Sequence, residues 1–401
     1  MPVSDDFVSL GEAFLADPHG SYALLHPRGT VHRAVTPDAA PVWLITGYRE
    51  VRSAAADPRL ALDKRHARTC GNAGDSLPPE LDAHLLNTDG PDHTRLRRLV
   101  TRALGPRRIG VLREQVQQCV DRLLDALTGH RRADIVADLA APLSMTVICD
   151  LLGVPDQDRV DFRTWTDSLL SPTPDAPLRS REAMRTMCRF LAGLIADKRA
   201  APGNDLLSEL IAARDDGDRL GEDELLAMAF LLLFAGYHNV VHLVSSTVLA
   251  LLTHPDQAAA LRSRRLTMHQ VTDEVLRWNP PGMLAVRRFA VEEIEIGGTT
   301  IGAGERVWLS WAAANRDPQA FGDPEVFAPV REPVPGTGPQ LAFGHGPHYC
   351  VGAALAGLEN EIAIGSLLRR FPGLALVQAP DRLRWVASLR SRGLTELRVT
   401  L

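Results

Sequence analysis

The sequence predicts a mainly α-helical fold with small β-sheets. From about residue 105 to residue 280, apolar residues recur every three or four positions, which is the spacing of amphipathic helices. Runs typical of strands cluster towards the two ends of the 401-residue chain. The only linker-like stretch, residues 328–340, leads directly into a glycine-rich segment. We therefore expect that stretch to be a loop packed on the core, and residues 1–401 to form a single domain.

The predicted strands are short. VHRAV at residues 31–35 and PVWLITG at residues 41–47 lie near the start of the chain. EIEIGGTTIGAGERVWLSW, residues 293–311, predicts a hairpin that turns at its paired glycines, followed by a further strand. LRWV at residues 383–386 and TELRVTL at residues 395–401 predict strands near the end. The longest predicted helix runs over residues 222–254, with acidic residues in its first turn and a proline directly after it.

The composition is that of an ordinary globular protein, with 45% hydrophobic and 23% charged residues. A net charge of −5 argues against a nucleic-acid-binding protein. The acidic first stretch, MPVSDDFVSLGEAF, lacks the pattern of a signal peptide, so we expect a cytoplasmic protein. Residues 225–252 contain no Asp, Glu, Lys or Arg, but YHNVVH and the polar residues 245–247 interrupt the apolar run. We expect a buried helix there and no membrane span.

The five cysteines are Cys70, Cys119, Cys149, Cys188 and Cys350. Their number is odd and no two form a C-x-x-C pair, so we expect no disulfide in a cytosolic protein. Cys119, Cys149 and Cys188 lie in apolar helical patterns, which predict core positions. Cys350 differs, because AFGHGPHYCVG surrounds it with glycine and histidine and a helical pattern follows.

Cys350 therefore stands at the start of a predicted helix. There the helix dipole and the unpaired N–H groups stabilise a thiolate and lower its pKa. The neighbouring glycines allow the backbone to approach the sulfur and a flat ligand closely. Such a loop also suits a nucleophilic cysteine or, with His345 and His348, a zinc site. Neither alternative has its partners, because no second cysteine or histidine pair at zinc spacing occurs in the sequence.

FGHGPHYCVG, residues 343–352, fits the signature F-x-x-G-x-x-x-C-x-G at every fixed position and thereby resembles the cytochrome P-450 haem-thiolate monooxygenases. The resemblance extends over nearly the whole chain and is strongest to soluble actinobacterial members that tailor natural products. It implies a single-domain fold with haem b between an oxygen-binding helix and the cysteine loop. Cys350 is then the iron ligand, with Phe343 beside the sulfur and Gly344 and Gly352 in the haem loop.

The same resemblance implies the reactants. They are O2 and a small-molecule substrate, which in this group of enzymes is a secondary metabolite. No flavin- or iron–sulfur-binding segment is evident in the sequence, so the electrons would come from a separate ferredoxin and ferredoxin reductase.

DEVLRWNPP places Glu274 and Arg277 three residues apart on a helix that ends near the two prolines. As a surface pair they would contribute about 0.2–0.5 kcal/mol. The resemblance instead implies a buried Glu-x-x-Arg pair joined by Arg331, whose disruption would cost about 3–5 kcal/mol. Ala328 stands where the family usually has aspartate.

Haem propionates need cationic or hydrogen-bonding partners. The resemblance assigns this role to four residues: His93, Arg97, Arg288 and His348. His93 and Arg97 share one helix face in DGPDHTRLRRLV, and Leu96, Leu99 and Val100 form its core stripe. Arg95, Arg98 and Arg102 point elsewhere on that helix. They form either a solvated face or a docking patch for an acidic ferredoxin.

The centre of the long helix matches the family's oxygen-binding motif, Ala-Gly-x-acid-Thr, only in part. Ala235 and Gly236 are kept, but His238 replaces the acid and Asn239 the threonine. Cleavage of the O–O bond needs protons. Asn239 can donate a hydrogen bond but is a poor relay, whereas His238 either shuttles protons or points away from the haem with no role.

Three hypotheses follow from the altered motif. In the first, ordered water or a polar substrate group supplies the missing hydroxyl, and the substrate is hydroxylated. In the second, the oxidant abstracts hydrogen and the substrate closes a new C–N, C–C or C–O bond. In the third, the chain binds a haem ligand without turnover.

The resemblance also assigns residues to the substrate pocket. They are largely apolar, which predicts a neutral, mostly apolar ligand with few polar handles. The pocket residues implied are Leu85, Leu86, Asn87, Leu231, Phe234, Met283, Leu284 and Val286.

Overall fold

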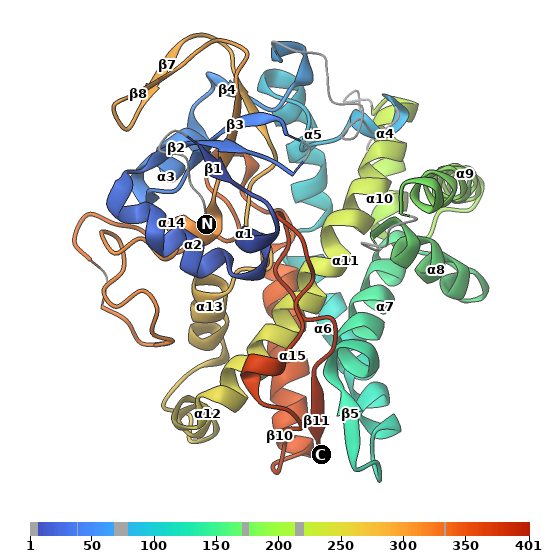
Figure 1. The fold of residues 1–401 in the computed structure, drawn as a ribbon. Coiled ribbons are helices and arrows are strands. Elements are labelled where there is room, and N and C mark those ends of the chain that lie inside the picture. Colours follow the sequence, from blue (N-terminus) through green and yellow to red (C-terminus); the bar gives the residue numbers. More distant parts are fainter. Residues whose placement is uncertain (1–6, 38, 68–78, 171–175, 213–219, 333) are drawn as a thin grey trace. The chain divides into compact units, whose positions relative to one another are not determined.

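The computed structural model describes residues 7–37, 39–67, 79–170, 176–212, 220–332 and 334–401 (Figure 1). The protein is 56% helical and has small sheets, which confirms the predicted fold class. Two compact units make up the chain. The first comprises Met1–Gly71, His242–Cys350 and Gln378–Leu397, and the second comprises Asn72–Val241, Val351–Val377 and Arg398–Leu401.

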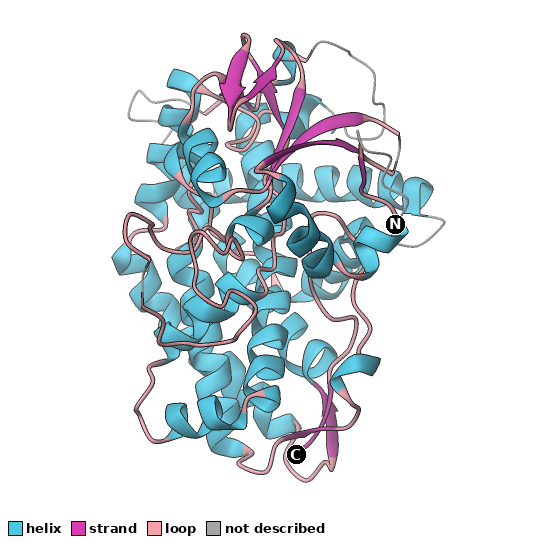
Figure 2. Cartoon of the chain, turned by 60° about the vertical axis from the view of Figure 1, so that its left-hand side comes forward, coloured by secondary structure: helices cyan, strands magenta, loops and turns pink. Residues whose placement is uncertain are grey.

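The first unit combines short helices with a sheet. Its helices are α1 (Glu12–Ala16), α2 (Pro18–Leu25), α3 (Tyr48–Ala56), α12 (Pro255–Arg262), α13 (Met268–Trp278) and α14 (Trp311–Ala314), with 3-10 turns η1 (His26–Arg28), η2 (Lys64–His66), η6 (Gly346–His348) and η7 (Pro380–Arg382). Its strands are β1 (Val8–Ser9), β2 (Val31–Val35), β3 (Pro41–Ile45), β4 (Leu60–Ala61), β6 (Arg288–Ala290), β7 (Ile294–Ile296), β8 (Thr299–Ile301) and β9 (Arg306–Leu309). Figure 2 shows the strands in magenta among the cyan helices.

The larger sheet has the strand order β1-β2-β3-β9-β6-β4, and β7 and β8 form a separate hairpin. β2 and β3 pair antiparallel, whereas β3 and β9 pair parallel. Because side chains alternate along a strand, neighbouring residues enter different core clusters. Leu44 and Trp308 pack in one cluster, and Ile45 and Val307 pack in the other. Both faces of the sheet are therefore covered, and the predicted strands in this part of the chain are confirmed.

The second unit is built mainly of helices. They are α4 (Pro79–Asp82), α5 (Gly90–Ala103), α6 (Pro106–Ala126), the π-helical η3 (Ile135–Ala140), α7 (Ala141–Leu152), the 3-10 turn η4 (Asp156–Asp158), α8 (Arg159–Leu170), α9 (Ala176–Ala200), α10 (Leu206–Ala212) and α15 (Ala353–Arg370), with the first part of α11 (Glu222–Thr253). Strands β10 (Ala375–Leu376), β11 (Arg398–Thr400) and β5 (Arg132–Asp134) form a three-stranded sheet in that order.

Two details of the predicted elements are wrong. LRWV does not form a strand, because only Trp385 makes an isolated bridge, to Leu394. The region predicted to be helical almost throughout contains β5, which pairs with β11 near the end of the chain. A pairing partner more than 260 residues away is not visible in a local apolar pattern.

Two helical segments, Ile135–Leu152 and Glu222–Thr253, have the length and hydropathy of membrane spans. In their most apolar windows, 67% and 72% of the residues are buried inside the protein. A helix that is apolar all round and buried is typical of a protein core. The burial of α11 agrees with the expectation for its uncharged stretch.

The four cysteines in the described part of the chain are free thiols. Cys119 and Cys149 are buried, and burial raises the pKa of the Cys149 thiol to about 12. Cys188 is half-buried and Cys350 is exposed. Cys70 lies outside the described residues. Cys350 therefore has the most accessible sulfur among the described cysteines.

Candidate active site

The loop before Cys350 folds back on itself. The backbone N–H of Cys350 donates to the carbonyl oxygen of Phe343 at 2.8 Å, and the Phe343 ring lies 6.3 Å from the Tyr349 ring, edge to face. This bond closes the signature segment into a compact turn that holds the cysteine at the surface of the first unit. The thiol is thus presented by backbone geometry, which the glycine content of the segment makes possible.

Two glycines in this loop have a left-handed backbone. Gly344 has φ +79° and Gly346 has φ +74°, a region that favours glycine. A Cβ at Gly346 would lie 3.0 Å from Cα and Cβ of Ala56, so the cysteine loop touches the last turn of α3. Gly352, by contrast, is the N-cap of α15 and has φ −89°. The backbone conformation therefore favours glycine at positions 344 and 346 but does not require it at position 352.

The first unit also holds two of the predicted propionate partners. Arg288 lies on β6, is 4% exposed, and donates to the carbonyl oxygens of Leu60 at 3.1 Å and Ala55 at 3.2 Å. These bonds orient the guanidinium. His348 ends the 3-10 turn η6, two residues before Cys350, and is half-buried.

The donor set of this unit fits haem b. An exposed thiol suits iron, and a buried guanidinium and an imidazole suit the two propionates. The second unit, taken by itself, supplies an apolar surface: Phe234 is 48% exposed and Ala235 is exposed, although the helix around them is largely buried.

The unusual motif lies in the middle of α11. Asn239 is exposed, and its amide Nδ2 donates to the carbonyl oxygen of Ala235 at 3.0 Å, so the side chain bonds back to its own helix. His238 is half-buried, with its ring 5.0 Å from the Tyr237 ring. Threonine at position 239 would place a hydroxyl where this amide lies.

Helix packing favours glycine at position 236, which the sequence did not show. A Cβ at this position would lie 2.5 Å from Cδ1 of Ile148 on α7. The glycine therefore lets α7 and α11 approach each other. We had treated Gly236 as part of the oxygen motif alone.

Ser144 was missed by the sequence analysis. It is buried on α7, and its Oγ donates to the carbonyl oxygen of Tyr237 at 3.0 Å and approaches that of Gly236 at 3.4 Å. The hydroxyl therefore binds the helix backbone directly beside the altered motif. A lone serine in an apolar helix carries no local signal of this role.

Helix α5 carries the remaining propionate candidates. His93 is 4% exposed and Arg97 is half-buried, while Arg98 and Arg102 are exposed. The core stripe of this helix, Leu96, Leu99 and Val100, is buried as predicted.

The sequence predicts Arg95 on a solvated face of α5 or in a docking patch. In the structure Arg95 instead forms a two-pronged ion pair with Glu224 in the first turn of α11. Burial raises the pKa of Glu224, but the hydrogen bonds from Arg95 and from the Gly221 N–H, together with the charge of Arg95, lower the pKa overall. Glu224, at the start of the long helix, thus pairs with Arg95 and also interacts favourably with the helix dipole.

Glu274 and Arg277 form a buried ion pair in the first unit. Their side chains are 5% and 3% exposed and make two hydrogen bonds of 2.8 Å. Arg331 Nη2 lies 3.1 Å from Glu274 Oε1, and the backbone N–H of Ala328 donates to the same oxygen at 2.8 Å. Arg277 also donates to three backbone carbonyls, so its charge is hydrogen-bonded on every side.

The residues predicted to line a substrate pocket have different environments. In the second unit, Leu85 and Leu231 are buried, whereas Leu86 and Asn87 are half-buried and Phe234 is exposed. Asn87 donates to Asp82 at 2.7 Å.

In the first unit, Met283 and Leu284 are 1% and 7% exposed and belong to the core cluster around Phe14 and Tyr22. Val286 is half-buried. Met283 is therefore packed as a core residue, which weakens its assignment to the pocket.

Comparisons with known proteins agree with the fit of these residues to haem b. The family model described as Cytochrome P450 matches residues 181–393. Cytochrome P450 107B1 of Saccharopolyspora erythraea is 44% identical over 98% of this chain and 97% of its own length. Cytochrome P450 monooxygenase PikC of Streptomyces venezuelae is also 44% identical, over 98% of this chain and 93% of that protein.

The fold of the chain is likewise similar to that of solved structures. The tirandamycin C-bound P450 monooxygenase TamI has a TM-score of 0.88 and 40% identity, covering 98% of this chain and 100% of that chain. The chain therefore belongs to the cytochrome P450 family, as an oxidoreductase of the monooxygenase class whose haem b is ligated through a cysteine thiolate.

Proposed function

We propose that this protein oxygenates a neutral, mostly apolar secondary metabolite, using O2 and electrons from a ferredoxin and its reductase. The observation that carries the proposal is the exposed Cys350 thiol in a loop closed by its own N–H bond to Phe343. The names of two similar proteins, which are monooxygenases, and the tirandamycin C bound to one of them support the reaction and the substrate class.

We assign Cys350 as the iron ligand. Phe343 packs beside the sulfur, and Gly344 and Gly352 shape the loop before α15. Arg288, His348, His93 and Arg97 hold the two propionates through charge-assisted hydrogen bonds. When bound, the haem supplies the activation of O2, assisted by electron donation from the thiolate.

Asn239 and His238 would manage protons in an unusual way. The Asn239 amide already donates to the Ala235 carbonyl, and an amide does not release and regain protons as a hydroxyl network does. We therefore infer that ordered water or a polar group of the substrate completes the hydrogen-bond chain. His238 carries an imidazole, a group that can accept and release protons, and is the candidate that brings protons from solvent.

The substrate contacts follow from the apolar character of the candidates. Phe234 and Ala235 present apolar surface, and Leu86 and Asn87 are partly accessible in the loop before α5. Leu85, Leu231, Leu284 and Val286 are the further candidates. None of these side chains carries a charge, so a neutral ligand fits best.

The electron donor and the location are also part of the proposal. A ferredoxin is an acidic partner, and the exposed arginines Arg98 and Arg102 on α5 are one candidate docking patch. Similar proteins come from bacteria, which supports a cytoplasmic location.

The spectrum of the carbon monoxide complex tests the haem assignment. Purified, dithionite-reduced protein should give the red-shifted absorption of a thiolate-ligated haem. Cys350→Ser should lose it, whereas Cys188→Ser, the matched control on α9, should keep it. A Cys350→Ser protein with an unchanged spectrum would overturn the assignment of the ligand.

Oxidative ring coupling is the second candidate, because Asn239 replaces the threonine of the oxygen motif. A screen of candidate metabolites for a change in the ferric spin state first identifies a ligand. Turnover of that ligand under labelled dioxygen then separates the two reactions. Label in the product supports oxygenation, and an unlabelled product with a new ring supports coupling.

A further inference from the structure

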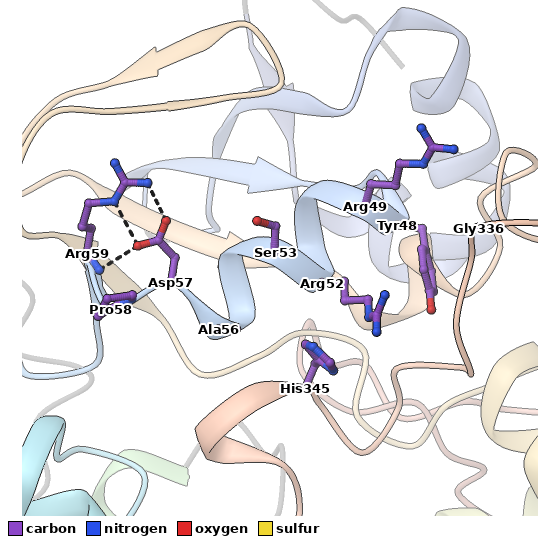
Figure 3. Close-up of a pocket in the computed structure, with 10 residues that line it drawn as sticks. All are labelled: Tyr48, Arg49, Arg52, Ser53, Ala56, Asp57, Pro58, Arg59, Gly336 and His345. Carbon is purple, nitrogen blue, oxygen red and sulfur yellow. Dashed lines mark hydrogen bonds and ion pairs between the residues drawn. The ribbon is translucent and has the colours of Figure 1, made fainter.

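A hollow of about 660 Å³ lies beside α3 in the first unit (Figure 3). Its lining includes Arg49, Arg52, Asp57, Arg59 and His345, and we name it the α3 hollow. Figure 3 shows Arg52 and His345 close to each other at one end, with Asp57 and Arg59 at the other. A volume of this size is typical of a small-molecule site, so the charges in the hollow decide what it can hold.

The aspartate of the hollow is already paired. Asp57 accepts from Arg59 Nε at 3.0 Å and from Arg59 Nη2 at 2.7 Å, a two-pronged pair. The hydrogen bond from Arg59 lowers the pKa of Asp57, so the carboxylate stays ionised and engaged. It is therefore not available as a counter-charge for Arg52 at the other end.

Arg52 is a cation of the hollow that lacks a counter-charge. Its side chain is half-buried, and it makes no ion pair or hydrogen bond with the residues that the structure describes. Burying a charged donor without an acceptor costs free energy, so an anion that enters the hollow would stabilise this guanidinium. Arg49, three positions earlier on α3, also has no ion pair within the described ranges, and Figure 3 shows its side chain directed away from Arg52.

The charge of Arg52 acts on two neighbouring side chains. Burial lowers the pKa of His345, and the charge of Arg52 lowers it further. Burial raises the pKa of Tyr48, whereas the hydrogen bond from the Gly338 N–H and the charge of Arg52 act against that rise. The neutral imidazole of His345 adds a hydrogen-bonding nitrogen but no counter-charge. This end of the hollow therefore keeps a positive potential.

Hydrogen bonds fix the wall beside Arg52. The Tyr48 hydroxyl donates to the carbonyl oxygen of Pro339 at 2.7 Å and accepts from the Gly338 N–H at 3.1 Å, and the Tyr48 N–H donates to Asp317 Oδ2 at 2.8 Å. A Cβ at Gly338 would lie 3.4 Å from Cζ of Arg52, so the guanidinium packs against this wall. A cation that is held in place before its ligand arrives loses little freedom on binding.

We propose that the α3 hollow binds the phosphate group of a small anion, with Arg52 as the cation that pairs with it and His345 as a neutral hydrogen-bonding neighbour. The planar fork of a guanidinium matches the oxygens of a phosphate group. The half-buried position of Arg52 favours a small ligand that can enter the hollow. Free phosphate and a phosphorylated metabolite share this chemistry, and the hollow has room for an organic group along Ser53, Ala56 and Pro58. The site is separate from the oxygenation reaction and does not depend on it.

A bound anion would join two segments that are far apart in the sequence. Arg52 belongs to α3, and His345 belongs to the loop that leads to Cys350. The same two segments already touch, because a Cβ at Gly346 would lie 3.0 Å from Cα and Cβ of Ala56. An occupied hollow should therefore stabilise the folded protein, as any ligand that binds the native state alone does.

Titration calorimetry of the ferric haem protein tests the site, with ionic strength held constant by sodium chloride. The probes are inorganic phosphate and ribose 5-phosphate, which has no nitrogen that could bind iron, and ribose is the uncharged control. Arg52→Gln should raise the Kd of both phosphates about 10-fold or more, because it removes a charged hydrogen-bond donor. Arg262→Gln, an exposed arginine in the last turn of α12, is the matched control with the same change of charge and should keep the Kd.

Arg52→Lys is a second variant, which keeps the charge and loses the planar fork, and it should weaken binding less than Arg52→Gln. Saturating phosphate should also raise the urea midpoint of the wild type more than that of Arg52→Gln. Tighter binding of ribose 5-phosphate than of inorganic phosphate assigns the hollow to a phosphorylated metabolite, and equal binding assigns it to free phosphate. Wild type that binds neither phosphate, a Kd unchanged in Arg52→Gln, or an equal loss in Arg262→Gln would overturn the proposal.

Discussion

Ser144 Oγ lies 3.0 Å from the carbonyl oxygen of Tyr237, and both belong to the joint between α7 and α11. A few ångströms away along α11, the absence of a side chain at Gly236 admits Ile148. One hydrogen bond and one close packing contact therefore hold the centre of the long helix beside its altered motif. The geometry of this joint sets where His238 and Asn239 stand on the helix surface.

Gly236→Ala should destabilise the protein by about 1 kcal/mol, because the new methyl group would meet Cδ1 of Ile148 at 2.5 Å. The atom in its way is the end of a flexible side chain, which limits the cost. Ile148→Val removes that atom and should cost about 1 kcal/mol alone. The double variant should be more stable than the sum of the single effects, measured by urea unfolding at equal haem saturation. Strict additivity would contradict the contact.

Glu274→Gln should lower the free energy of unfolding by about 3–5 kcal/mol, because it leaves the buried charges of Arg277 and Arg331 without their carboxylate. Glu361→Gln is the control. Its pair with Arg113 spans 3.5 Å and both side chains are about half exposed, so less than about 1 kcal/mol is expected. Similar losses for the two variants, in urea at equal haem saturation, would refute a special role for the buried pair.

His32→Gln should flatten the loss of stability on acidification. Burial lowers the pKa of His32 from 6.5 to about 4, and its Nε2 lies 3.1 Å from Thr46 Oγ1. The unfolded chain binds the proton more readily, so stability contributed by this group is present above pH 6.5 and is lost as pH falls towards about 4. The difference between wild type and variant across that window should reach about 3 kcal/mol, measured from urea midpoints. If the stabilities of wild type and variant changed with pH in parallel, His32 would not contribute to the loss of stability in acid.

Glu359→Gln should have the opposite pH dependence. Glu359 is 2% exposed, its Oε2 has no hydrogen-bond partner among the described residues, and burial raises its pKa well above 4.5. The folded protein keeps this proton while the unfolded chain releases it, so the wild type loses stability as pH rises above 4.5. The variant carries a neutral amide and should gain on the wild type between about pH 5 and about pH 8. A constant difference in urea midpoints would show that the carboxyl group is ionised in the fold.

Asn239→Thr should raise the yield of product per NADPH and lower the release of hydrogen peroxide, since a hydroxyl can both donate and accept a proton. Asn239→Val is the matched control, because valine has the shape of threonine without the hydroxyl. With a ligand found by the spin-state screen, the two variants should differ about 10-fold in coupling. Equal coupling in the two variants would contradict the expectation that a hydroxyl at position 239 improves the proton path that water or the substrate completes.

Much of the fold is visible in the sequence because it depends on local pattern. The alternating burial along β2 reflects side chains that point to opposite faces of the sheet, and the apolar length of α11 reflects its burial. The features that the sequence did not predict depend on contacts between residues far apart in the chain. β5 exists through its pairing with β11, and Arg95 is held by Glu224, more than 120 residues away. Neither partner leaves a periodic signal.

The candidate site shows the same division. The spacing around Cys350 is a local signature, so the haem loop could be named from ten residues. Gly236 and Ser144 act through contacts between two helices. Arg52, on a helix near the start of the chain, and His345, in a loop near its end, line the same hollow. Such groups become apparent only when the chain is folded.

Ala328 reaches Glu274 through its main-chain N–H, so the contact is independent of the side chain at that position. Alanine can therefore replace aspartate at position 328 without loss of this hydrogen bond to the ion pair. A search pattern that insists on the acid would discard sound members of the family, whereas one that scores the length of the segment between Glu274 and Arg331 would retain them.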